Sequence, residues 1–158
     1  MTDVPDAGAV LVGVDGSGGS RAAIRLAAKE ASYRAAPLIA VMAYSGEGPL
    51  GGPATRPVAT IRTSDDEQAI AESALHDAVR AALGEQAGVV QRRAVLGLAG
   101  RRLVETAVQA NAQLIVLATH GSISMLIGTV SQYVLRNAPC PVLVVPAVGQ
   151  AARAAGGA

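Results

Sequence analysis

Two stretches of small residues have the composition of phosphate-binding segments. Residues 13–20 read GVDGSGGS, and residues 118–131 read ATHGSISMLIGTVS. Glycine lets a ligand approach the main chain closely, and the free N–H groups at a helix N-terminus attract an anion. Each stretch follows a short apolar run, as a loop at the end of a buried strand does. The chemistry that they suggest is the binding of a phosphorylated ligand.

The first stretch departs from both common phosphate-binding motifs. Gly13, Gly18 and Ser20 have the spacing of a P-loop, but Gly19 stands where the phosphate-binding lysine belongs. The dinucleotide pattern G-x-G-x-x-G fails too, because an arginine stands at the third glycine position. Two interpretations stay open. Either Asp15 contacts a ligand, or the stretch is a turn that leads to Ser20 as a helix N-cap.

The second stretch ends where a helix is predicted to begin, and its polar groups gather there. The N–H groups of Gly128 and Thr129, with the hydroxyls of Thr129 and Ser131, would face an anion at that helix N-terminus. The alternative interpretation is ordinary capping of the helix by Thr129.

Other reactive side chains form no recognisable catalytic or metal-binding pattern. His76 and His120 lack ligand spacing, so we predict a solvated His76 and no metal site built from protein ligands alone. His120 either touches a ligand or faces solvent. Cys140, between two prolines before an apolar run, is predicted to be a small core residue. Neither a Ser-His-Asp order nor paired carboxylates indicate a hydrolase, and we assign no catalytic residue.

Short apolar runs alternate with segments of helical periodicity along the chain. Strands are predicted at residues 10–14, 38–43, 89–96, 114–118 and 142–145, and helices at residues 20–36, 64–83, around 103–108, and 129–137. This alternation predicts an α/β fold with a parallel sheet and helices on both faces. In such a sheet, ligands bind beyond the carboxyl ends of the strands, where both small-residue stretches lie.

The composition narrows the class of protein. With 158 residues, of which 51% are hydrophobic and 16% charged, the chain is predicted to form one ordered domain. A net charge of +1 and 2% aromatic residues argue against a nucleic-acid partner, and the absence of an 18-residue apolar run argues against a membrane partner. The single cysteine, and an N-terminus unlike a signal peptide, predict a cytoplasmic location. We expect a tail over residues 1–8, a domain over 9–146 with a flexible loop at 45–63, and a mobile tail over 147–158.

Residues 12–17, VGVDGS, and residues 128–145 resemble the universal stress protein family. The second match begins GTVSQ and ends VLRNAPCPVLVV, and the resemblance spans about residues 9–146. It implies a five-stranded parallel sheet of order 3-2-1-4-5 with the adenine-nucleotide alpha-hydrolase-like fold. It also implies a homodimer paired through the last strand, here Val142, Leu143, Val144 and Val145.

Nucleotide-binding members of that family carry the pattern G-x-x-G, nine residues, then G-[S/T]. In this chain Gly121 matches the second glycine, Gly128 the third, and Thr129 the final hydroxyl. Ala118 stands at the first glycine position, which adds a methyl group where a ligand approaches the main chain. Only six residues separate Gly121 from Gly128, so this loop is shorter than the family pattern.

The resemblance also implies an adenosine site. Asp15 matches an acidic residue near the adenine and ribose, and Ala43 matches a second-strand position whose main chain meets the adenine ring. The leading hypothesis is a regulatory protein that binds an adenine nucleotide, ATP with Mg²⁺, as a sensor with little or no turnover. Its predicted nucleotide-binding residues are Asp15, Ala43, Ala118, Gly121, Gly128, Thr129 and Ser131.

Two other functions stay open. The shortened loop and Ala118 favour a nucleotide-free dimeric stress or interaction protein with an unidentified protein partner. A very slow ATPase ranks last, because no general base is evident beside the predicted phosphate position.

Overall fold

Strands and helices alternate in the computed structural model, which describes residues 8–45, 64–119 and 128–146. The predictions for the two tails, for nearly all of the 45–63 loop, and for His120 and Gly121 lie outside these residues. The described elements are β1 (Val10–Gly13), α1 (Gly18–Tyr33), β2 (Leu38–Tyr44), α2 (Ser64–Leu83), the 3₁₀ helix η1 (Gly84–Val89), β3 (Gln91–Leu96), α3 (Ala99–Gln109), β4 (Leu114–Ala118), α4 (Thr129–Asn137) and β5 (Val142–Val145).

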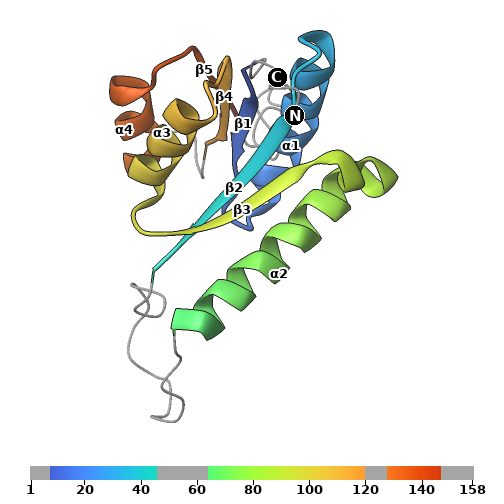
Figure 1. Ribbon diagram of the computed structural model, residues 1–158, viewed down its shortest axis with the longest axis vertical. Coiled ribbons are helices and arrows are strands. Elements are labelled where there is room, and N and C mark those ends of the chain that lie inside the picture. Colours follow the sequence, from blue (N-terminus) through green and yellow to red (C-terminus); the bar gives the residue numbers. More distant parts are fainter. Residues whose placement is uncertain (1–7, 46–63, 120–127, 147–158) are drawn as a thin grey trace, which may run out of the picture.

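The five strands form one parallel sheet in the order β3-β2-β1-β4-β5 (Figure 1). This is the 3-2-1-4-5 order expected from the sequence, so the predicted fold is confirmed. β1 lies at the centre, where Val10, Leu11 and Val12 are fully buried. A strand covered on both faces needs a continuous apolar run, which explains the residue types of β1.

Helices cover both faces of the sheet, and the core has two layers. Successive strand residues point to opposite faces. Val10 and Val12 therefore pack in the cluster that includes α1 and α2, whereas Leu11 and Val41 pack in the cluster that includes α3 and α4. Figure 1 shows α1 and α2 on one side of the sheet and α3 and α4 on the other.

Two helix N-termini differ from the prediction. α1 begins at Gly18 with Ser17 at the N-cap, so the prediction that Ser20 caps this helix is wrong. Ser20 lies inside the first turn, where its hydroxyl bonds a neighbouring carboxylate instead. α4 begins at Thr129 as predicted, but its N-cap residue is Gly128, so Thr129 is not the cap.

The other boundaries lie close to their predicted positions. β3 starts at Gln91 rather than Val89, because η1 occupies the preceding residues and leaves Val89 85% exposed. It lies at the edge of the sheet, which explains its polar first residues. β1 ends at Gly13, one residue early, and β2 extends to Tyr44.

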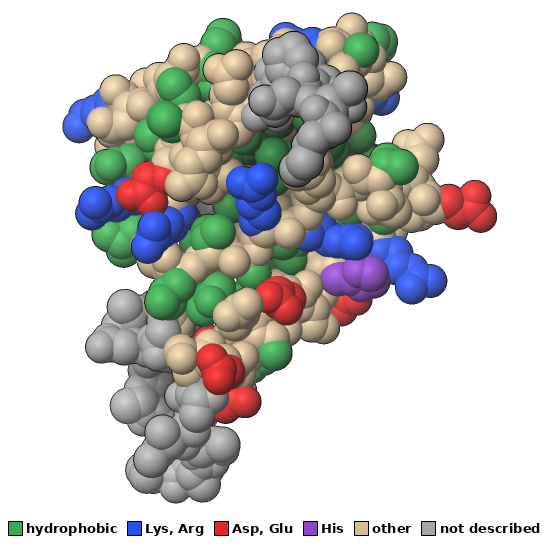
Figure 2. Space-filling model, viewed as in Figure 1, with side chains coloured by type: hydrophobic (Ala, Val, Ile, Leu, Met, Phe, Trp, Pro, Cys, Tyr) green, Lys and Arg blue, Asp and Glu red, His purple; other side chains and the backbone are tan. Residues whose placement is uncertain are grey.

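Charged residues of both signs are distributed over the described surface. On the face drawn in Figure 2, basic and acidic side chains are interspersed. Acidic residues also occupy the first turn of α2, where they complement the helix dipole. Among the helices of the described ranges, none is long and apolar enough to cross a membrane.

Candidate functional site

A cleft of about 330 Å³ opens at the carboxyl ends of the central strands. Its lining comes from the end of β1 and the loop after it, from β2 and β4, and from the first turns of α1, α3 and α4. The parallel register brings these segments together, since Gly13 pairs with Val41 and Val12 pairs with Val116. The cleft is therefore built by the topology from segments that are distant in the sequence.

Six of the residues singled out from the sequence line this cleft. They come from four separate stretches of chain and are Asp15, Ala43, Ala118, Gly128, Thr129 and Ser131. The seventh, Gly121, lies outside the described residues. Their convergence is a geometric finding, and their role in nucleotide binding stays a prediction.

The floor of the cleft is apolar and was not foreseen. Val41, Leu103 and Leu117 are buried side chains that line it. A β-carbon at Gly13 would lie 2.8 Å from Leu117 Cδ2 and 3.1 Å from Leu103 Cδ1, so these leucines can occupy the floor only because residue 13 lacks a side chain. An apolar floor with a few polar groups above it suits an organic ring system.

Asp15 is held at the rim of the cleft by its own loop. The Ser20 hydroxyl donates to Asp15 Oδ1 at 2.6 Å, and the Ser17 N–H donates to the same oxygen at 2.9 Å. The Asp15 N–H in turn donates to Ser20 Oγ at 3.2 Å. Gly16 has φ +81°, a left-handed conformation that glycine adopts at little cost, and it lets the loop turn back on itself.

The first turn of α4 provides hydrogen-bond donors to the lining of the cleft. Its N-cap, Gly128, has no side chain to occupy the free N–H groups of the turn. Among the described atoms, none lies within 4 Å of the position that a Gly128 β-carbon would take. Ser131 is buried in the same turn and Thr129 is exposed beside it. The arrangement can accept an anion through N–H and hydroxyl donors.

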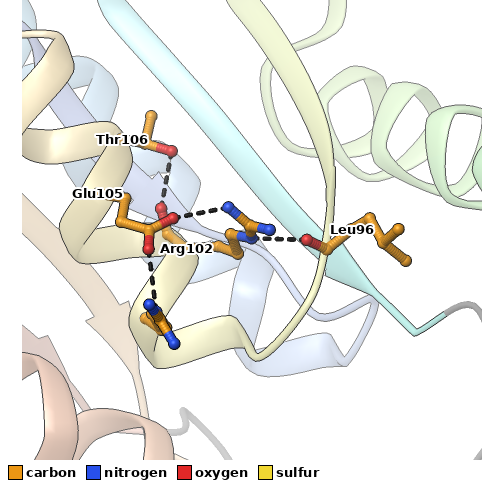
Figure 3. A network of polar contacts seen from close by, with 5 residues as sticks. Leu96, Arg102, Glu105 and Thr106 are labelled. Carbon is orange, nitrogen blue, oxygen red and sulfur yellow. Dashed lines mark hydrogen bonds and ion pairs between the residues drawn. The ribbon is translucent and has the colours of Figure 1, made fainter.

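Asp15 is the single formally charged residue in the described lining. Arg101 and Arg102 lie in the first turn of α3 and pair with Glu105 instead of lining the cleft, as Figure 3 shows for Arg102. Arg101 Nε lies 3.0 Å from Glu105 Oε1, and Arg102 contacts Glu105 Oε2 at 2.7 Å. Hydrogen bonds from Arg101 and then Arg102 lower the pKa of Glu105.

Two other reactive side chains of the described residues, His76 and Cys140, are not part of the cleft lining. His76 is exposed on α2. Cys140 is half-buried against the core on the α3 and α4 side, and burial raises the pKa of its thiol. A raised pKa disfavours the nucleophilic thiolate, which fits the predicted packing role. Among the residues of the described ranges, no cluster of three or more His, Cys, Asp or Glu side chains could hold a metal ion.

Comparisons with known proteins agree with this architecture. The family model described as the universal stress protein family matches residues 8–146. A protein of the universal stress protein family from Burkholderia pseudomallei is 28% identical, with a TM-score of 0.61 over 90% of this chain and 98% of that chain. Universal stress protein UspA from Lactobacillus plantarum is 26% identical, with a TM-score of 0.64 over 88% of this chain and 97% of that chain.

A third solved structure carries a ligand. It is a universal stress protein in complex with cAMP, 26% identical, with a TM-score of 0.60 over 89% of this chain and 98% of that chain. Among curated proteins, none matches the chain significantly. The solved structures share the adenine-nucleotide alpha-hydrolase-like fold, as expected from the sequence.

Proposed function

Because the chain belongs to the universal stress protein family, we propose that its cleft binds an adenine nucleotide, ATP with Mg²⁺, and acts as a sensor with little or no turnover. The observation that carries the proposal is the convergence of six separately singled-out residues on one cleft. A family member in complex with cAMP supports the nucleotide class.

The apolar end of the cleft suits the adenosine part of the ligand. Val41 and Leu117 offer buried apolar side chains to a purine ring. Ala43 also lines the cleft. It lies two residues after Val41 in β2, where its main chain can meet the edge of the ring. Asp15 at the rim is a hydrogen-bond acceptor for hydroxyl or amino groups of the nucleoside.

The first turn of α4 suits the phosphates. Gly128, Thr129 and Ser131 supply N–H and hydroxyl donors, and we propose that Gly121 adds a further main-chain contact. Since the described lining contains no lysine or arginine, the charge of a triphosphate would be offset by Mg²⁺ carried on its phosphates. We therefore expect Mg²⁺ to strengthen the binding of ATP much more than that of cAMP, which has a single negative charge.

Competition titration against a fluorescent ATP analogue tests this proposal. ATP with Mg²⁺ should displace the analogue saturably, and GTP should compete poorly because the site recognises adenine. Gly128→Val should weaken ATP binding by about tenfold or more, since the new side chain projects into the space offered to phosphate. Its fold should persist because a β-carbon at this position has no described atom within 4 Å.

The matched control is Gly88→Val. Gly88 also has open space around its β-carbon position, but it lies in η1, outside the cleft. Its affinity for ATP should equal that of the unaltered protein. Equal affinities for ATP and GTP, or a Gly128→Val protein that binds ATP normally, would count against the proposal.

A second candidate is the nucleotide-free interaction protein, and one observation favours it. The family pattern has a glycine at the position of Ala118. The methyl group of Ala118 lies in the cleft lining, 3.5 Å from the position that a β-carbon of residue 19 would take. If the unaltered protein displaces no analogue at millimolar ATP, this candidate replaces the sensor.

A further inference from the structure

The hydroxyl of Ser20 is buried, although Ser20 is not the N-cap of the helix that contains it. It is 1% exposed and lies in the first turn of α1, which is capped by Ser17. A buried hydroxyl must find a hydrogen-bond partner, and a serine inside a helix commonly bonds a carbonyl of the preceding turn. Here the partner is Asp15, five residues earlier and outside the helix.

The contact between Ser20 and Asp15 runs in both directions. The Ser20 hydroxyl donates to Asp15 Oδ1 at 2.6 Å and accepts from the Asp15 N–H at 3.2 Å. A distance of 2.6 Å is typical of a hydroxyl bonded to a charged carboxylate. The Ser17 N–H adds a second donor to the same Oδ1 at 2.9 Å. The main chain and the side chain of Asp15 are thus both hydrogen-bonded to the buried Ser20 hydroxyl.

We infer that Ser20 is a positioning residue that holds the Asp15 carboxylate in the orientation in which it meets the ligand; this rests on the proposed function. Asp15 is exposed, and without the Ser20 hydroxyl its carboxylate would lose the shorter of these two hydrogen bonds and be held less firmly in one rotamer. Ordering a side chain on binding costs affinity, and a preorganised acceptor avoids that cost. In this proposal, residues 16–20 orient the Asp15 carboxylate and do not themselves bind phosphate.

A double-mutant cycle on ATP affinity tests the inference. Ser20→Ala should weaken the binding of ATP with Mg²⁺ by about fivefold, the size expected when one side chain must be ordered on binding. In the Asp15→Ala background, where nothing is left to position, Ser20→Ala should change affinity by less than about twofold. Ser32→Ala, an exposed serine on the same helix, should leave affinity unchanged and controls for the substitution type.

Amide hydrogen exchange gives a readout that needs no nucleotide. In the free protein, Ser20→Ala should speed exchange of the Asp15 and Ser17 amides by about tenfold or more. The Gly97 amide, which bonds the Tyr44 carbonyl at 2.8 Å, should be unaffected. Ser20→Cys, which fills the same space with a weaker donor, serves as a second variant should the alanine protein fold poorly.

Two results would overturn the inference. One is equal weakening by Ser20→Ala with and without Asp15, which would mean that Ser20, itself a residue of the cleft lining, acts by direct contact with the ligand or through the fold and not through Asp15. The other is unchanged exchange at Asp15 and Ser17. If the unaltered protein binds no nucleotide, the proposed function is rejected and the positioning role falls with it, whereas the exchange data still decide whether Ser20 holds Asp15 in place.

Discussion

The absence of a side chain at Gly13 leaves room for the buried leucines that form the cleft floor. A β-carbon there would lie 2.8 Å from Leu117 Cδ2 and 3.1 Å from Leu103 Cδ1. Both leucines are 4% exposed, so they have little free space except the cleft itself. Gly13→Ala should therefore narrow the cleft and lower the free energy of unfolding by about 1–3 kcal/mol. Urea denaturation measures the stability.

The control for that substitution is Gly18→Ala. Gly18 is the first residue of α1 and has no described atom near its β-carbon position, so alanine there should be neutral or stabilising. A Gly13→Ala protein as stable as the Gly18→Ala protein, with unchanged ATP affinity, would contradict this account of the floor.

The polar residues of the cleft were easier to foresee than the apolar ones. Asp15 stands at the end of an apolar run and Thr129 at the start of a predicted helix, and such strand ends and helix N-termini are where ligands bind in parallel α/β sheets. Leu103 and Val41 carry no such signal, because their place in the lining depends on strand register and helix packing. Ser20 was misinterpreted since a serine before a helical segment has the same residue type whether it caps the helix or bonds a nearby carboxylate.

The connection between β3 and α3 is secured by one arginine. Arg102 Nε donates to the Leu96 carbonyl at 2.6 Å, while its other end pairs with Glu105 (Figure 3). Arg102→Ala should cost about 1 kcal/mol of unfolding free energy through the lost bond to the main chain. Since Ala99 of α3 lines the cleft, ATP affinity should fall slightly as well.

Arg101→Ala is the matched control, because Arg101 pairs with Glu105 but not with the main chain of β3. Its exposed ion pair should contribute little to stability, and less than the main-chain bond of Arg102. Because both arginines lower the pKa of Glu105, the pairs are intact above the ordinary glutamate pKa and are lost as pH falls through the lowered value. Equal effects of the two substitutions near neutral pH would exclude a special role for Arg102.

At the scale of elements, the sequence predicted which helices and strands exist and in what order better than it predicted where each begins and ends. β4, α4 and β5 have the predicted bounds and α2 ends at the predicted Leu83, because an apolar run, a glycine or a proline marks most of these ends; Ser64, predicted as the N-cap of α2, is its first residue. α1 starts two residues early, at Gly18, since glycine gives no local signal of a helix start. η1 was not foreseen, because a short 3₁₀ helix has no periodicity of its own.

At the scale of the whole molecule, β5 is an edge strand of the sheet with an apolar sequence. An apolar edge favours pairing with another chain, and universal stress proteins are commonly oligomeric. We propose a homodimer through Val142, Leu143, Val144 and Val145, as the family resemblance implies. Sedimentation should then show dimers at micromolar concentration.

Val144→Lys tests that interface with little harm to the core. Val144 is half-buried and, unlike its three neighbours in β5, belongs to neither core cluster of the described residues. The substitution should shift the protein toward monomers, whereas Val89→Lys, at an 85% exposed position in η1, should not. A Val144→Lys protein that sediments as a dimer would place the interface elsewhere.

The sheet order and the place of the cleft followed from the β-α alternation together with the family resemblance. The dimer and the ligand are implied by the resemblance alone and stay predictions, because both depend on surfaces that meet another molecule. Their identity is a question of affinity, which sequence pattern alone does not determine.

The most direct test of the central claim is a thermal melt over a concentration series of ATP with Mg²⁺. A ligand at a hundred times its dissociation constant stabilises the folded state by about 2.7 kcal/mol, which should raise the midpoint of this chain by roughly 5–10 °C. The account predicts a saturable shift of that size in the unaltered protein, and in Asp15→Ala a series displaced to higher ATP concentrations. A flat series up to millimolar nucleotide in the unaltered protein would contradict it.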